Sequence, residues 1–69
     1  MKSKKDEGNN FFKKEKYQSA IDCYAEYVKS DHPDNSKAYA NMALSFFRIK
    51  KYENCVKACE SAVELEPEN

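Results

Sequence analysis

Two sets of side chains in this sequence share a spacing and a chemistry that suit an anionic ligand. Lys5, Asn9 and Phe12 are separated by four and three residues, so they lie on one face if their segment is helical. An ammonium group offers charge and three donors, and an amide offers two donors to the same kind of oxygen. The second set, further along the chain, consists of Lys37, Asn41, Leu44 and Arg48. Each set thus combines donors with one apolar residue, and both suit a peptide that ends in a carboxylate.

The cysteines and the histidine are weaker candidates for chemistry. Cys55 and Cys59 are four residues apart, but zinc takes four ligands and His32 is the single histidine of the chain. A nucleophilic cysteine or serine needs a base and an orienting group, and no cluster of that kind is evident. We therefore expect core thiols, no metal site, no cofactor and no enzymatic activity, with Cys23 near the surface of its helix.

The composition predicts one small domain with no membrane segment. The 69 residues are fewer than the roughly 70–80 at which a single core becomes comfortably stabilising, so we expect a repeat unit, an oligomer or a fragment of a larger protein. No apolar run approaches the ~18 residues of a membrane span. Twelve basic side chains balance twelve acidic ones, which argues against nucleic acid as a partner. Three cysteines without an export signal indicate a reducing compartment, so we expect a protein of the cytoplasm or the nucleus.

The sequence repeats itself with a period of 34–35 residues. The match drops from 35 to 34 at the end, where Pro33 aligns with Pro67, so the first copy has one extra residue. A regular period of this size is typical of stacked helical units. A shift of 35 aligns identical residues: Phe11 with Phe46, Phe12 with Phe47, Lys16 with Lys51, Tyr17 with Tyr52, and Val28 with Val63.

Each copy is predicted to form two helices. Apolar residues recur at three- and four-residue steps in both copies, which is the signature of amphipathic helices. Pro33 and Pro67 mark ends, because the residue before a proline is displaced from the helical region. The four helices are expected near residues 2–14, 17–30, 36–49 and 52–65.

Small side chains before the third helix and within the first indicate how these helices begin and pack. Asp34, Asn35 and Ser36 are expected to cap the third helix, since their side-chain oxygens can accept from free backbone N–H groups. Gly8 lies inside a helical pattern, where it costs about 1 kcal/mol relative to alanine. We therefore expect Gly8 to allow a close approach of two antiparallel helices.

These residues resemble the tetratricopeptide repeat over nearly the whole chain. The resemblance implies an all-α fold of two tandem helix-turn-helix hairpins, an α-solenoid with right-handed superhelical stacking. Residues 1–34 and 35–69 would be the two repeats of a single solenoid domain. Tyr27 departs from the pattern, since it replaces a usual alanine. The positions that match are Gly8, Asn9, Phe11, Phe12, Tyr17, Ala20, Ile21 and Tyr24, then Tyr39, Ala43, Phe46, Tyr52, Cys55, Cys59 and Ala62.

The opening of the chain also resembles one subfamily, the dicarboxylate-clamp domains of heat-shock co-chaperones. In that subfamily a lysine and an asparagine of the first helix, and an asparagine of the third, hold the last aspartate of a Glu-Glu-Val-Asp tail. Lys5, Asn9 and Asn41 match these positions. The resemblance implies a non-enzymatic adaptor for the tails of ninety- or seventy-kilodalton chaperones. Two basic residues on a fifth helix complete the family clamp, and they are not among the four helices expected here.

A structural alternative stays open. About three repeats are normally needed for a stable array, so two hairpins are expected to need a covering partner. Cys59, Ala62 and Val63 would form an apolar face on the last helix. The chain could then be a scaffold or a self-association module that binds another protein through its groove or through this helix.

Overall fold

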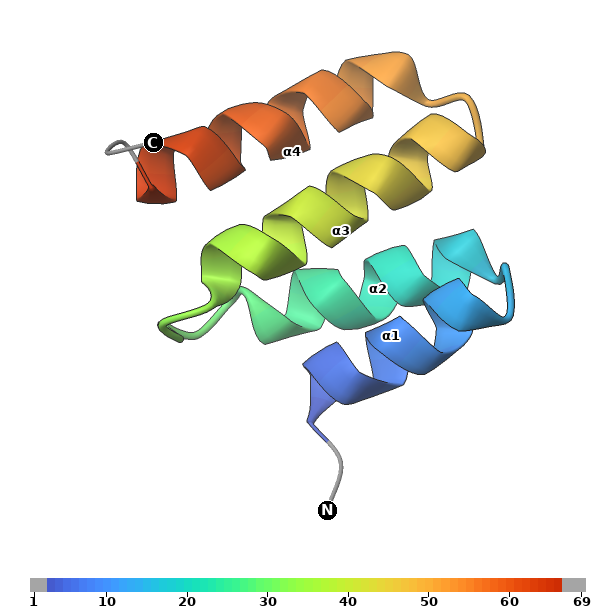
Figure 1. Ribbon diagram of the computed structural model, residues 1–69, viewed down its shortest axis with the longest axis horizontal. Coiled ribbons are helices and arrows are strands. Elements are labelled where there is room, and N and C mark those ends of the chain that lie inside the picture. Colours follow the sequence, from blue (N-terminus) through green and yellow to red (C-terminus); the bar gives the residue numbers. More distant parts are fainter. Residues whose placement is uncertain (1–2, 67–69) are drawn as a thin grey trace.

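Four α-helices form two antiparallel hairpins in the computed structural model, which describes residues 3–66 (Figure 1). The prediction of an all-α fold with two hairpins is confirmed. The second helix ends earlier than the predicted residue 30, because the chain turns directly after Tyr27. The predictions for residue 2 and Pro67 lie outside the described residues. The helices are α1 (Lys4–Lys13), α2 (Tyr17–Tyr27), α3 (Asn35–Arg48) and α4 (Tyr52–Leu65).

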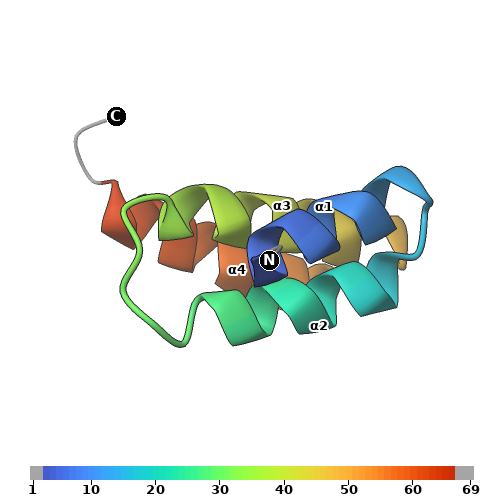
Figure 2. The same cartoon turned by 90° about the horizontal axis from the view of Figure 1, so that it is seen from below.

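The helices are arranged in a thin slab of two layers. Helices α1 and α3 lie on one side of the slab, and α2 and α4 lie on the other (Figure 2). The slab measures 32 × 31 × 17 Å. Each helix packs mainly on its neighbours in the sequence, α2 on both α1 and α3, and α4 on α3. Contacts between successive elements of this kind are typical of a stacked repeat.

The sequence period is also a period of the backbone. Glu15 and Lys50, which are equivalent under the 35-residue shift, both adopt a left-handed conformation, with φ of 62° and 65°. A residue in this conformation commonly terminates a helix. The two hairpin turns are therefore the same structure built twice. The same backbone hydrogen bond follows each of them, at 2.8 Å: Lys16 N–H to Phe11 C=O, and Lys51 N–H to Phe46 C=O.

The core is centred on α2, which is covered from two sides. Tyr24 is fully buried and is the largest side chain with no exposure. A Cβ atom added to Gly8 would lie 2.8 Å from Cε1 of Tyr24, so the expected close approach at this glycine is confirmed, with an aromatic ring as the partner. The buried core cluster consists of Ala20, Ile21, Tyr24, Ala38 and Met42.

The predicted cap of the third helix is wrong. Asp34 occupies the N-cap position of α3, but its side chain makes no capping hydrogen bond. Its carboxylate is directed to other groups, as described below. Asn35 and Ser36 are buried residues of the helix itself. The capping hydrogen bond that does form is at α1, where the hydroxyl of Ser3 accepts from the backbone N–H of Asp6 at 3.2 Å.

The surface position predicted for Cys23 is also wrong. Cys23 is 8% exposed, and burial raises the pKa of its thiol. The charges of Glu7 and Lys4 in α1 act on it, so it lies within reach of the neighbouring helix. Ala20 and Tyr27 lie three residues before and four residues after Cys23, so they share its side of α2, and Ala20 is fully buried there.

Candidate functional site

Lys5, in the first turn of α1, is bound to an acidic residue in the turn that leads into α3. Its Nζ donates a hydrogen bond to Oδ2 of Asp34 and forms an ion pair with it. The hydroxyl of Tyr27 donates to the second oxygen, Oδ1, at 2.6 Å. Both hydrogen bonds favour the charged carboxylate, so they lower the pKa of Asp34 from 3.8 to about 2, with Lys5 as the larger cause. The same contact raises the pKa of Lys5.

The turn that carries Asp34 is held by a second layer of contacts. The ring of Tyr27 stacks on His32, with 3.9 Å between ring centres and 10° between planes. Nδ1 of His32 lies 3.2 Å from Oδ1 of Asn35, and Nδ2 of Asn35 donates to the carbonyl of Ser30 at 2.8 Å. The aromatic pair and the amide therefore fix the turn and, with it, the position of Asp34.

Asn9 and Asn41 meet between the two hairpins, around the hydroxyl of a buried tyrosine. The Tyr24 hydroxyl donates to Oδ1 of Asn9 at 2.5 Å. Nδ2 of Asn41 lies 3.4 Å from the same oxygen and 3.5 Å from the Tyr24 hydroxyl. The oxygen of Asn9 is thus directed inward, and within residues 3–66 its Nδ2 has no protein acceptor. Asn9 can therefore donate from Nδ2 to a ligand.

Tyr24 keeps its proton and so keeps this donor role. Burial raises the pKa of its phenol, and the hydrogen bond from Asn41 opposes that rise only in part. Since the ring is also wedged against Gly8, Tyr24 holds the Asn9 amide in one orientation.

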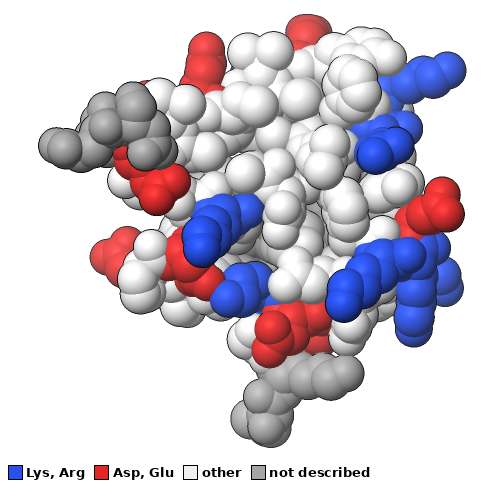
Figure 3. Space-filling view, viewed as in Figure 1, with Lys and Arg blue, Asp and Glu red and all other residues white. Residues whose placement is uncertain are grey.

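The other predicted site residues are spread over the α1/α3 side of the slab. Phe12 is half-buried against the core and meets the ring of Tyr17 edge-on, 5.4 Å between centres. Leu44 is 41% exposed, and Lys37 and Arg48 are exposed. Figure 3 shows this face, where basic and acidic side chains adjoin one another along the left side and the centre is uncharged. The face is therefore less purely cationic than the spacing of the lysines predicts.

Sequence reasoning missed three residues of this site: Asp34, Tyr24 and Tyr27. Asp34 was expected to be a cap and Tyr24 a plain core residue. The available signal was Tyr27, a large hydroxyl-bearing side chain where the repeat usually has a small one. Such a departure indicates that the position has a local polar partner.

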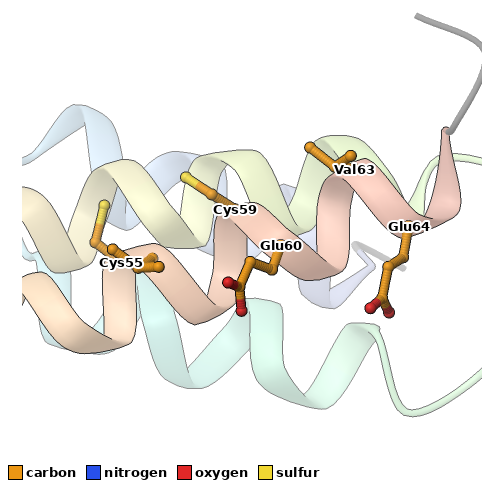
Figure 4. A pocket seen from close by; sticks show the side chains of 6 residues that line it. Cys55, Cys59, Glu60, Val63 and Glu64 are labelled. Carbon is orange, nitrogen blue, oxygen red and sulfur yellow. The ribbon is translucent and has the colours of Figure 1, made fainter.

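A second candidate surface lies on α4, where Val56, Cys59 and Val63 are exposed. Figure 4 shows Cys59 and Val63 along this helix. Under the 35-residue shift Val56 corresponds to Ile21, yet Val56 is 55% exposed and Ile21 only 5%. Helix α3 covers α2, whereas no described element covers α4 in the same way. The expected apolar face is confirmed at Cys59 and Val63, while Ala62 is half-buried. The expectation of a core thiol is wrong for Cys59, which is exposed because no described element covers this side of α4. This exposed side of α4 forms a shallow hollow. The hollow is lined by Cys55, Val56, Cys59, Glu60, Val63 and Glu64.

Two other kinds of site, a membrane span and a metal site, are absent from the described part of the chain. None of the helices there combines the length and apolar character needed to cross a bilayer. Within the same residues no three metal-ligating side chains are grouped closely enough to hold a metal ion.

Residues 36–69 match the family model of the tetratricopeptide repeat. The small glutamine-rich tetratricopeptide repeat-containing protein beta of Homo sapiens is 41% identical over 56 residues, which cover 81% of this chain and 18% of that protein. RNA polymerase II-associated protein 3 of Xenopus laevis is 41% identical over 63 residues, 91% of this chain and 9% of that protein. Mitochondrial import receptor subunit TOM70 of Rattus norvegicus is 37% identical over 67 residues, 91% of this chain and 11% of that protein. The chain thus spans less than a fifth of each of these relatives, and no solved structure matches it significantly.

Proposed function

The chain belongs to the tetratricopeptide repeat family, a family of protein-interaction modules, and we propose that it binds the acidic C-terminal tail of a heat-shock chaperone. It would act as a non-enzymatic co-chaperone adaptor for the Glu-Glu-Val-Asp type of tail, on a chaperone of the ninety- or seventy-kilodalton class. Residues 1–34 and 35–69 would be its two repeats. This proposal rests on the match of Lys5, Asn9 and Asn41 to the dicarboxylate clamp that the chain resembles.

One observation supports the proposal most directly: two amides from different hairpins meet at one place. Nδ2 of Asn41 lies 3.4 Å from Oδ1 of Asn9, and the Tyr24 hydroxyl holds that oxygen inward. The donor side of Asn9 is therefore already oriented, so a bound carboxylate would not have to fix it. Preorganised donors of this kind lower the entropic cost of binding.

The proposed roles follow the chemistry of each side chain. Lys5 provides charge, and the two asparagines provide amide donors to the terminal carboxylate. Hydrogen bonds to a charged group contribute roughly 1.5–3 kcal/mol each, so two or three fix the end of a short peptide. Phe12 and Leu44 would contact the aliphatic residue next to it. The peripheral cations that would attract the acidic residues are Lys37 and Arg48.

Titration of a Glu-Glu-Val-Asp peptide against Lys5→Glu tests the assignment. We expect the affinity to fall by at least about tenfold, the loss of one charge-assisted hydrogen bond. Lys4→Glu is the matched control, because it makes the same charge change one residue away, where Lys4 is exposed and pairs with Glu7. An amidated peptide should bind much more weakly than the free acid. Equal affinity of the wild type and Lys5→Glu would reject the assignment.

We also propose that the protein acts in the cytoplasm or the nucleus. Cys23, Cys55 and Cys59 are all free thiols, as is usual in a reducing compartment.

The second candidate function is docking of a partner helix on α4, as in a scaffold or a self-association module. The observation that favours it is the exposure of Val56 and Val63 at positions where the first hairpin is covered by α3. The partner would be an amphipathic helix with small and medium apolar residues four apart, like Ala38 and Met42 of α3. Basic side chains beside them would meet Glu60 and Glu64 of the hollow.

A sizing experiment separates this candidate from the tail-binding proposal. If copies of the chain associate through α4, the apparent mass should rise with concentration, and Val63→Glu should abolish the rise. Leu44→Glu places the same charge on an exposed position of α3 outside this hollow, so it should leave the rise unchanged. A mass that is unaffected by concentration would exclude self-association.

A further inference from the structure

We propose that Asp34 is a built-in competitor for the acidic tail: its carboxylate occupies the Lys5 ammonium group that the tail must take over. The inference rests on the proposed function of Lys5 and adds a regulating residue to that site. It predicts that the wild-type protein binds the tail more weakly than a protein in which Lys5 is free of Asp34.

The contact between Lys5 and Asp34 differs from the other ion pairs of the described residues. Lys4 pairs with Glu7, and Lys29 with Glu26, each within one turn of its own chain segment. The Lys5–Asp34 pair instead joins residues 29 positions apart and bridges α1 to the start of α3. It is also the least exposed of the three, with side-chain exposures of 32% and 26%. Asp34 is thus an acid from another part of the chain, brought to the lysine as a ligand would be.

The carboxylate is held in this place by a dedicated donor. An aspartate at an N-cap normally accepts from backbone N–H groups of its own helix, but Asp34 makes no such bond. One of its oxygens binds Lys5 and the other accepts from the Tyr27 hydroxyl at 2.6 Å. The stacking of Tyr27 on His32 keeps that hydroxyl in position. Asp34 therefore presents a carboxylate to Lys5 in the way that we propose for the peptide end.

The competition sets a requirement on the ligand. A single carboxylate would exchange one ion pair of Lys5 for another and gain little. A tail that carries a terminal carboxylate and acidic side chains offers more negative charge than Asp34 alone, so it can displace it. Both partners remain partly exposed, which leaves the exchange open to a ligand from solvent. Asp34 would thus favour multiply acidic tails over chains that end in one carboxylate.

The test compares the affinity of the free-acid Glu-Glu-Val-Asp peptide for four proteins by calorimetry. Asp34→Asn keeps the shape and an acceptor for Tyr27 but removes the charge, and we expect the affinity to rise about two- to fivefold, the scale of a partly exposed ion pair. Tyr27→Phe, which removes the hydroxyl that holds Asp34, should raise the affinity by a smaller factor. Asp31→Asn is the matched control, since Asp31 is an exposed acid of the same turn and has no ion pair among the described residues. The wild type is the reference.

Each outcome decides the matter. A rise in affinity for Asp34→Asn without a rise for Asp31→Asn supports competition by Asp34. Binding by Asp34→Asn with no binding by the wild type would also support it, as complete competition. If the wild type binds and Asp34→Asn binds equally or more weakly, Asp34 only positions Lys5, and the inference fails while the proposed function stands. An equal rise for both variants would indicate a general charge effect and overturn the inference. If none of the four proteins binds the tail, the proposed function and the inference fail together.

Discussion

Replacement of Gly8 by alanine is expected to destabilise the protein, although the same change stabilises an ordinary helix. At an open helical position alanine is better than glycine by about 1 kcal/mol. Here the new Cβ would lie 2.8 Å from Cε1, 3.0 Å from Cδ1 and 3.1 Å from Cζ of Tyr24. These distances are below van der Waals contact, so either the ring or helix α1 must move.

The Tyr24 ring has little freedom to make room. It is fully buried, and its hydroxyl donates to Asn9 at 2.5 Å. Overpacking of a filled core costs about 1–3 kcal/mol, and a ring confined in this way places the cost in the upper part of that range. After subtraction of the gain in helix propensity, we expect a net loss of about 1–2 kcal/mol. For a domain of this size the loss corresponds to a fall in Tm of about 5–15 °C.

Urea and thermal denaturation, followed by circular dichroism, measure this loss. Gly8→Ala should also weaken tail binding, because a displaced Tyr24 no longer orients Asn9. The double variant Gly8→Ala, Tyr24→Leu tests the cause, since a smaller side chain should relieve most of the penalty of the added methyl. A Gly8→Ala protein as stable as the wild type would refute the close-approach reasoning.

Three further predictions follow from the contacts of single side chains. Tyr24→Phe should cost about 0.5–1.5 kcal/mol in urea denaturation and should lower tail affinity, because Asn9 loses its anchor; unchanged affinity would contradict the positioning role. The pKa of Asp34 is lowered from 3.8 to about 2, so its contribution to stability should be complete above pH 4 and lost as the pH falls through about 2. Melting of wild type and Asp34→Asn across that range checks this, and a difference that persists below pH 2 would count against it. In native thiol labelling the exposed Cys59 should react first and the buried Cys23 last, and equal rates would show that Cys23 is accessible.

The sequence alone was sufficient for the helices and their order. Apolar residues at three- and four-residue steps, and the shift that aligns Phe11 with Phe46, depend on local spacing, which a helix preserves. The close approach at Gly8 was predictable for the same reason, since a glycine in a helix needs a packing explanation. The match of Lys5, Asn9 and Asn41 to a carboxylate clamp also came from the sequence, and its function stays a prediction.

The tertiary structure alone decided which partners these residues have. Asp34 looked like a cap because it stands before a helix, yet its carboxylate lies on Lys5, 29 positions away. The inward orientation of Asn9 depends on the Tyr24 hydroxyl of the next helix, and Cys23 is buried although it was expected near the surface. Periodicity fixes which side of a helix a residue occupies, whereas partners across helices depend on how the helices approach and on which polar groups compete for each donor.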